Sequence, residues 1–221
     1  IINESKNYTI LLGHVIVGYY TDESIDGLET LDKFNSKKYE KVSLDSETKF
    51  LNYIWDAISY NESVLLDDAN YYRHWQSPKE DYSKGVHYLE KSQIFIHESV
   101  KIHPNVVIDA TDGAVILDEN VKIMAGSTIL GPCYIGKNST IKVGAKIYGN
   151  TSIGEVCKVG GEVEGSIIQS YSNKQHDGFL GHSFISEWVN LGADTNTSDL
   201  KNTYSEITVL QRHNEVKTGI M

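Results

Sequence analysis

The residue with the clearest potential for chemistry is His176, which stands in a polar stretch at positions 164–178. An imidazole has an unperturbed pKa of about 6.5, so at neutral pH it can accept a proton from a reacting group as a general base. A carboxylate on the other ring nitrogen would fix the tautomer. A second polar stretch, 197–202, follows, and two polar loops on one rigid scaffold predict a cleft. Taken alone, the pattern leaves two alternatives open, a solvated loop histidine and a solvent-facing acidic edge at Glu162 and Glu164.

The scaffold that would position these residues follows from a repeat of six. Counted in sixes from Leu117, the first residues are all aliphatic: Leu117, Ile123, Ile129, Ile135, Ile141, Ile147, Ile153 and Val159. The fifth residues are small or β-branched: Val121, Ser127, Cys133, Ser139, Ala145, Thr151, Cys157 and Val163. The fourth residues include types that tolerate a positive φ in a tight turn: Asn120, Gly126, Asn138, Gly144 and Asn150.

A period of six fits a three-sided prism in which short strands form the faces and Asn or Gly turns the corners. The sequence therefore predicts a mainly β fold, a left-handed parallel β-helix of hexapeptide repeats over residues 92–221. A β-sandwich would instead show alternation with a period of two. The ladder continues outside the regular part: Ile96, Ile102 and Ile108 upstream after a three-residue insertion, and Phe179, Ile185 and Leu191 downstream after the polar break.

Residues 1–91 have a different character, irregular and acidic, and predict a small α/β segment. The β-branched and aromatic run from Tyr8 to Tyr20 predicts one or two strands around Gly13, and polar residues 22–47 predict a loop. Helical spacing of apolar residues predicts a helix over 46–60, capped by Asp45 or Ser46 and ended by residues 61–63. The aromatic cluster at 71–75 predicts a linker that packs on another part of the protein, with stacking on a ligand as the alternative.

The composition and the termini of the chain restrict the classes of protein to which it can belong. The chain has 221 residues and a formal net charge of −10, with two arginines, which argues against a nucleic-acid partner. Its apolar runs are too short to span a bilayer and no secretory leader is visible, so we expect a cytoplasmic protein without a membrane partner. The chain begins with Ile1 and ends without a polar tail, so we expect an excised piece of a longer protein.

No structural metal is expected. His176 and His182 are six residues apart, as are His97 and His103, but residues six apart lie on different faces of the prism and cannot converge on zinc locally. Two cysteines make no disulfide framework. Both occupy the fifth slot of the repeat, so we expect reduced, structural thiols.

The run SNKQHDGFLGHSFISEWVNLGADTNTSDLKN at 172–202 resembles the acetyltransferase half of a known bifunctional family, N-acetylglucosamine-1-phosphate uridyltransferase/glucosamine-1-phosphate acetyltransferase. The similarity covers about 46–221 and is greatest to a variant branch labelled sugar-phosphate nucleotidyltransferases. It implies an N-acetyltransferase of nucleotide-sugar biosynthesis that uses acetyl-CoA and an amino-sugar phosphate and forms homotrimers. It also implies that residues 1–91 are the tail of a nucleotidyltransferase domain plus a helical linker, and that C-terminal coils are missing.

The resemblance also implies roles for individual residues. The catalytic base falls on His176, and the glutamate that orients it falls on Glu164 by hexad phase or on Glu162 by counting back from the histidine. The family's asparagine-aliphatic-glycine-alanine signature falls on 190–193. There Asn190 would face the reacting groups.

The cofactor and substrate contacts implied by the same motif complete the expected site. Gly192 and Ala193 would contact acetyl-CoA, with the Ala193 amide at the thioester. Lys201 is the expected loop lysine, and Asn173 and Lys174 are expected to bind substrate. Without the motif, Lys201 would be surface charge, and Asn190 and Gly192 turn residues.

Departures from the family pattern leave a second function open. The family's phosphate-binding arginine and lysine have no direct counterpart, and by phase their positions approach Tyr148 and Ser166, although Lys142, Lys146 or Lys174 are candidates to replace them. The aromatic hydroxyl that the family carries three residues after the histidine is absent, because Phe179 occupies that position. The alternative is therefore a non-catalytic, trimerising or regulatory β-helix of a sugar-phosphate nucleotidyltransferase.

Overall fold

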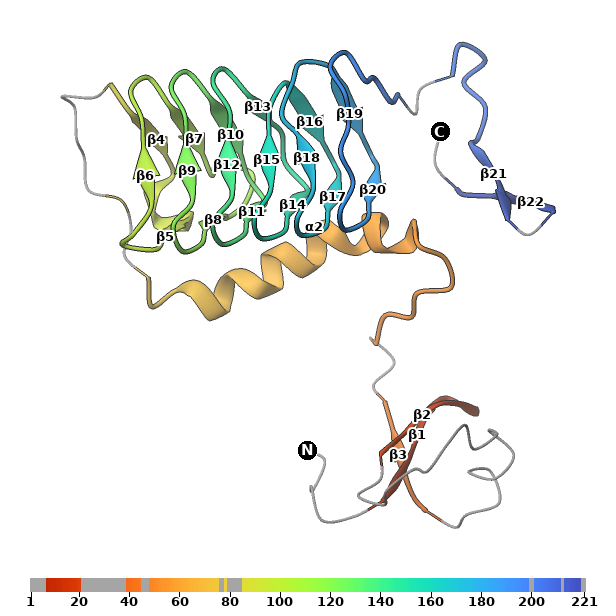
Figure 1. Ribbon diagram of the computed structural model, residues 1–221. Coiled ribbons are helices and arrows are strands. Elements are labelled where there is room, and N and C mark those ends of the chain that lie inside the picture. Colours follow the sequence, from red (N-terminus) through yellow and green to blue (C-terminus); the bar gives the residue numbers. More distant parts are fainter. Residues whose placement is uncertain are drawn as a thin grey trace. The chain divides into compact units, whose positions relative to one another are not determined.

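The computed structural model describes residues 7–20, 39–44, 48–75, 78, 85–198, 201–211 and 213–219. The chain divides into two compact units, Ile1–Phe50 and Leu51–Met221 (Figure 1). The second unit holds a long helix and a solenoid, and it contains every residue singled out for chemistry.

The first unit contains a three-stranded sheet. Strands β1 (Tyr8–Leu12) and β2 (Val15–Tyr20) form an antiparallel hairpin, with Gly13 at a φ of 60° in the turn. The two strands predicted around Gly13 are therefore confirmed. Strand β3 (Glu40–Ser43) pairs in parallel with β1. The predicted loop over 22–47 is thus wrong at 40–43, where pairing with β1 outweighs the polar local sequence, while 22–38 and 45–47 lie outside the described residues.

The helix of the second unit, α2 (Asp56–Asp68), is displaced from its predicted position at 46–60. It begins later because the Asp56 carboxylate accepts hydrogen bonds from the Asn52 and Tyr53 N–H groups, at 2.7 and 3.0 Å, and so closes the preceding turn. It continues through 61–63 because Asn61 is buried against the solenoid. Its Nδ2 donates to the Asn150 carbonyl, and Ser152 Oγ donates to its Oδ1 at 2.7 Å.

The solenoid has three parallel sheets, which form three faces (Figure 1). The first face comprises β4 (His87–Leu89), β7 (Val107–Asp109), β10 (Thr128–Leu130), β13 (Lys146–Ile147), β16 (Glu162–Glu164) and β19 (Phe179–Gly181). The second face comprises β5 (Ile94–Ile96), β8 (Val115–Leu117), β11 (Cys133–Ile135), β14 (Thr151–Ile153), β17 (Ile167–Ile168) and β20 (Phe184–Ile185). The third face comprises β6 (Lys101–Ile102), β9 (Lys122–Ile123), β12 (Thr140–Ile141), β15 (Lys158–Val159) and β18 (Asn173–Lys174).

The predicted repeat sets the core. All eight aliphatic residues of the first slot, from Leu117 to Val159, are at most 1% exposed, and the eight fifth-slot residues from Val121 to Val163 are equally buried. Asn120, Asn138 and Asn150 turn corners at φ values of 57–59°. The mainly β solenoid class is therefore confirmed, because the inward aliphatics stack from coil to coil in a dry column.

The polar stretch at 164–178 does not interrupt the solenoid, contrary to our expectation. Ile168 pairs with Ile153, and Lys174 pairs with Val159, so two further strands continue the second and third faces. The coil contains fewer residues than the regular coils. The inward positions downstream therefore no longer follow the six-residue count. Leu180, not Phe179, pairs with the inward Val163 and is 1% exposed, so the prediction for Phe179 was wrong.

Aromatic residues after the helix pack on the second face, which agrees with the packing role predicted for 71–75 and identifies its partner. The 3-10 helix η1 (Ala69–Tyr72) follows α2, and Tyr72 lies with its ring centroid 4.7 Å from that of Trp75 and 6.2 Å from that of Tyr134. Phe95 and Ile116 are buried beneath this group. The helix and its extension therefore cover the second face.

Two short elements complete the described chain. The 3-10 helix η3 (Lys91–Gln93) precedes β5, and a hairpin of β21 (Thr208–Gln211) and β22 (Asn214–Lys217) lies near the C-terminus. The described helices include none long and apolar enough to cross a bilayer.

Candidate active site

His176 is exposed at the corner where the third face passes into the first, between β18 and β19. The corner is held from inside: the Lys174 ammonium donates to the His176 carbonyl at 2.9 Å. Within the described ranges, no side chain is recorded in a hydrogen bond with the His176 ring. The imidazole is thus presented to solvent from a backbone segment that is fixed by the coil beneath it.

Glu162 and Glu164 lie on β16, in the coil below the histidine corner, on either side of the inward Val163. The Glu162 N–H donates to the Gly178 carbonyl at 3.2 Å, so Glu162 begins its strand directly beneath that corner. Glu164 lies at the other end of the strand, where its carbonyl accepts from the His182 N–H at 3.0 Å. Strand register therefore places Glu162 nearer to the His176 corner than Glu164.

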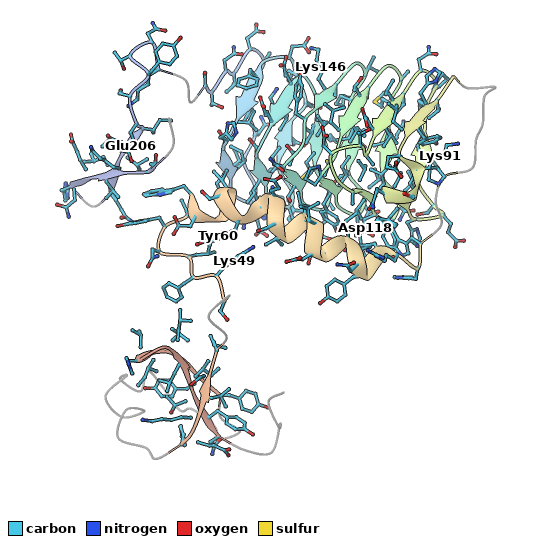
Figure 2. All side chains as sticks on the ribbon, turned by 180° about the vertical axis from the view of Figure 1, so that it is seen from behind. Lys49, Tyr60, Lys91, Asp118, Lys146 and Glu206 are labelled. Carbon is cyan, nitrogen blue, oxygen red and sulfur yellow. The ribbon has the colours of Figure 1, made fainter. Side chains whose placement is uncertain are left out.

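The first face carries a small polar surface beside Glu162. Lys146 pairs with Glu162 across β13 and β16, and its Nζ lies 3.7 Å from the Glu162 carboxylate. The Glu162 charge, with partial burial, raises the pKa of the Tyr148 phenol. A hollow of about 120 Å³ adjoins them, lined by Thr128, Leu130, Lys146, Ile147 and Tyr148. Figure 2 shows Lys146 on the side of the solenoid away from helix α2.

The signature residues 190–193 lie on the next coil, stacked on the one that carries His176. Asn190 bridges to Asn173 on the third face, and the Leu191 N–H donates to the Asn173 carbonyl at 2.8 Å. The Asp194 N–H donates to the Asp177 carbonyl at 3.0 Å, which ties the end of the signature to the residue after His176.

Gly192 and Ala193 are exposed on this coil. In the part of the chain that the structure describes, no acceptor is recorded for the Ala193 N–H. The structure thus brings His176, Glu162 and the Ala193 amide to adjoining coils at one corner.

Two predicted substrate contacts lie elsewhere. Lys174 is 3% exposed at an inward position, and its ammonium is bonded to backbone carbonyls inside the column. Lys201 is exposed, and its Nζ donates to the Glu206 carbonyl at 2.7 Å within the C-terminal segment.

Of the residues considered as phosphate contacts, some lie away from Glu162 and one lies beside it. Ser166 is fully buried, and its hydroxyl donates to the Glu164 carbonyl at 2.7 Å. Lys142 follows β12 on the third face, whereas Lys146 is on the first face with Glu162. The geometry therefore favours Lys146.

Asn196 is a site residue that the sequence reasoning missed. Its Oδ1 accepts a hydrogen bond from the Phe179 N–H at 2.7 Å, and its Nδ2 donates to the Asp194 carbonyl at 2.8 Å. It therefore fastens the signature coil to the strand that follows His176. The available signal was its position just after the Asn-Leu-Gly-Ala signature.

Neither cysteine contributes to this site, because Cys133 and Cys157 are free, buried thiols. Burial raises the pKa of the Cys133 thiol to about 12, so it is not a nucleophile at neutral pH. No group of three His, Cys, Asp or Glu side chains within the described ranges is arranged to hold a metal ion.

One family model and several known proteins are similar to this chain in sequence. The family described as bacterial transferase hexapeptide (six repeats) matches residues 114–149. The bifunctional protein GlmU of Rippkaea orientalis is 26% identical over 167 residues, which cover 66% of this chain and 35% of that protein. GlmU of Anaplasma marginale is 31% identical over 119 residues, covering 50% of this chain and 27% of that protein.

The predicted hexapeptide repeat is thus confirmed, and the matches indicate the transferase class. The resemblance to the bifunctional uridyltransferase/acetyltransferase family is also confirmed, since several GlmU proteins match the chain. The chain spans about a third of the length of the curated relatives it matches.

Proposed function

We propose that the chain carries the acetyl-transfer site of an acetyl-CoA-dependent N-acetyltransferase, which acts on an amino-sugar phosphate in nucleotide-sugar biosynthesis. The observation that carries the proposal is the corner at His176, where an exposed imidazole, the Glu162 strand and the Ala193 amide lie on adjoining coils. The GlmU relatives support the substrate class. Free, buried cysteines agree with a reducing compartment such as the cytoplasm.

The chemistry assigned to this corner is proton removal coupled to acyl transfer. His176 accepts a proton as the substrate amine attacks the thioester carbonyl carbon, and such general-base assistance is worth about 10²–10⁴-fold. The oxygen of the tetrahedral intermediate gains negative charge, and the Ala193 N–H is the group we assign to stabilise it. The intermediate then collapses with loss of the thiolate, which takes the proton that His176 accepted from the amine. A single N–H donor to the oxyanion, such as that of Ala193, is typically worth about 10²–10³-fold in rate.

Glu162 is our choice for the carboxylate that orients the imidazole. It begins its strand directly beneath the His176 corner, whereas Glu164 stands at the far end of the same strand. Its ion pair with Lys146 is largely exposed, so the pair is weak and the carboxylate can turn toward the ring.

The acceptor phosphate is assigned to Lys146. A single flexible ammonium holds a phosphate as a point charge and lacks the bidentate geometry of an arginine. Asn173 and Asn190, adjacent on the third face, are the side chains that we assign to sugar hydroxyls. We also propose a homotrimer, as in the family that the chain resembles, with neighbouring copies completing each site.

The competing function is a non-catalytic scaffold for a nucleotidyltransferase. Phe179 in place of an aromatic hydroxyl and the burial of Lys174 favour it. Calorimetric titration of the intact protein with acetyl-CoA separates the two functions. The enzyme should bind acetyl-CoA and release thiol when glucosamine 1-phosphate is added, whereas a scaffold should do neither.

The matched variants are His176→Ala and His14→Ala. His14 is exposed in the β1–β2 turn of the other unit, so its loss controls for removal of an imidazole. We expect thiol release to fall at least about 10²-fold in His176→Ala and to stay at the wild-type rate in His14→Ala. Wild-type turnover in His176→Ala would reject the assignment of the base.

A further inference from the structure

Lys174 occupies a position that the repeat gives to an aliphatic residue. On the third face the inward residues of successive coils are Ile123, Ile141 and Val159, and Lys174 pairs directly above Val159. At 3% exposure, it places an ammonium inside a column of hydrocarbon. Burial lowers the pKa of this ammonium, and the negative charge of Asp177 partly offsets the effect. A buried charge of this kind is unfavourable unless it is well bonded.

The shortened corner at Gly160 and Gly161 makes room for the ammonium. In regular corners a small side chain fills the interior; Ser127 Oγ, for example, donates to the carbonyls of Met124 and Lys142 at 2.9 and 2.8 Å. Gly161, at a φ of 68°, has no such side chain, and a Cβ there would lie 2.8 Å from Lys174 Nζ. The Lys174 ammonium therefore occupies the space that the missing side chain of Gly161 leaves.

The Lys174 ammonium takes over the role of the corner hydroxyl. Its Nζ donates to the Gly160 carbonyl at 3.0 Å and to the His176 carbonyl at 2.9 Å, and so joins the lower coil to the catalytic corner. A charged donor forms stronger hydrogen bonds than a neutral hydroxyl. Just outside the same corner, the Asp177 carbonyl accepts from the signature coil.

We propose that Lys174 is a positioning residue for His176: its buried ammonium clamps the carbonyls of Gly160 and His176 and so fixes the backbone that presents the imidazole. The proposal rests on the proposed function, because it assigns Lys174 a task in the same reaction. It replaces the role of substrate contact expected from the sequence. Errors of about 1 Å in placing a catalytic group can reduce rates about 10²-fold.

The test compares Lys174→Met with Lys101→Met in the intact protein. Methionine fills the same space without the ammonium, and Lys101 is an exposed lysine on the same face in an earlier coil. For Lys174→Met we expect retained secondary structure, a kcat lower by about 10²-fold and an unchanged KM for acetyl-CoA. Lys101→Met should match the wild type in all three. Wild-type kcat in Lys174→Met would overturn the proposal.

Amide hydrogen exchange of residues 175–178 provides a readout that does not depend on activity. Exchange should be faster in Lys174→Met than in wild type and unchanged in Lys101→Met. If the wild type lacks turnover but exchange responds in this way, the acetyltransferase function fails while the clamp stands. If turnover is present but exchange and kcat are unaffected, the clamp fails alone.

A second variant covers the case in which Lys174→Met does not fold. Lys174→Gln keeps an N–H donor on a shorter side chain that cannot bridge both carbonyls. It should fold, with reduced kcat and faster exchange at 175–178. If both variants lose their fold while Lys101→Met keeps it, Lys174 is only a structural residue and the proposal is overturned.

Discussion

Val156 is a corner residue whose replacement should stabilise the solenoid. It adopts a φ of 57°, a region that β-branched residues avoid, and it is 45% exposed. Directly along the same corner the chain uses Asn120 and Asn138, at φ values of 57° and 59°. The left-handed conformation costs an ordinary L-residue about 1–2 kcal/mol, and asparagine tolerates it better. Val156→Asn should therefore raise the free energy of unfolding by about 1 kcal/mol.

The matched control is Val143→Asn. Val143 is 64% exposed in a corner of the same solenoid, but its φ is not positive. The exchange of valine for asparagine is thus the same, without relief of backbone strain. Side-chain contact between stacked corner asparagines has a precedent here, since Asn120 Nδ2 donates to Asn138 Oδ1 at 3.2 Å.

Thermal unfolding followed by calorimetry is the assay. For a domain of this size, 1 kcal/mol corresponds to a shift of about 2–4 °C in Tm. We expect a rise of that order for Val156→Asn and none for Val143→Asn. Equal shifts in the two variants would refute the argument from backbone strain, because only one of the two positions has a positive φ.

Three further predictions concern buried polar groups. Asn61→Ala should lower the free energy of unfolding by about 2 kcal/mol, since it removes the hydrogen bonds of Asn61 to the solenoid. The control is Asn70→Ala at an exposed position. Equal losses of stability for the two variants in urea titrations would contradict the prediction. Tyr134→Phe should lower the free energy of unfolding by about 1–3 kcal/mol, because the buried Asp118 carboxylate loses a hydrogen-bond donor at 2.7 Å. Tyr171→Phe removes an exposed hydrogen bond to Glu155 and should lower it by less than about 0.5 kcal/mol. Because burial lowers the folded-state pKa of Lys174, the unfolded chain binds more protons between that value and 10.5. The stability of the wild type relative to Lys174→Met should therefore rise with pH across this window, and a pH-independent difference would contradict the assignment.

Much of the fold could be predicted because the hexapeptide rule is local. Each inward aliphatic from Leu117 to Val159 is specified by its own six residues and needs no knowledge of distant contacts. The phase was lost where a coil shortens at Gly160 and Gly161, because two glycines do not reveal how many residues a corner uses. Phe179 was therefore assigned inward in place of Leu180.

The remaining errors arise from tertiary contacts. Asn61 is typical of a helix end in sequence, but its partners are 89 and 91 residues away, and they keep the helix going. Lys174 is expected from the sequence to bind substrate, but the shortened corner turns it inward. At the site, counting alone left Glu162 and Glu164 as equal alternatives, and only the register of β16 against β19 distinguishes them.

The central claim is that the His176 corner transfers an acetyl group to an amino-sugar phosphate. Mass spectrometry of the products tests it most directly, with glucosamine 1-phosphate, isotopically labelled acetyl-CoA and the intact protein. The wild type and His14→Ala should yield an acceptor that carries the labelled acetyl group, and His176→Ala should yield almost none. Labelled product from His176→Ala at the wild-type rate, or none from the wild type, would contradict the claim.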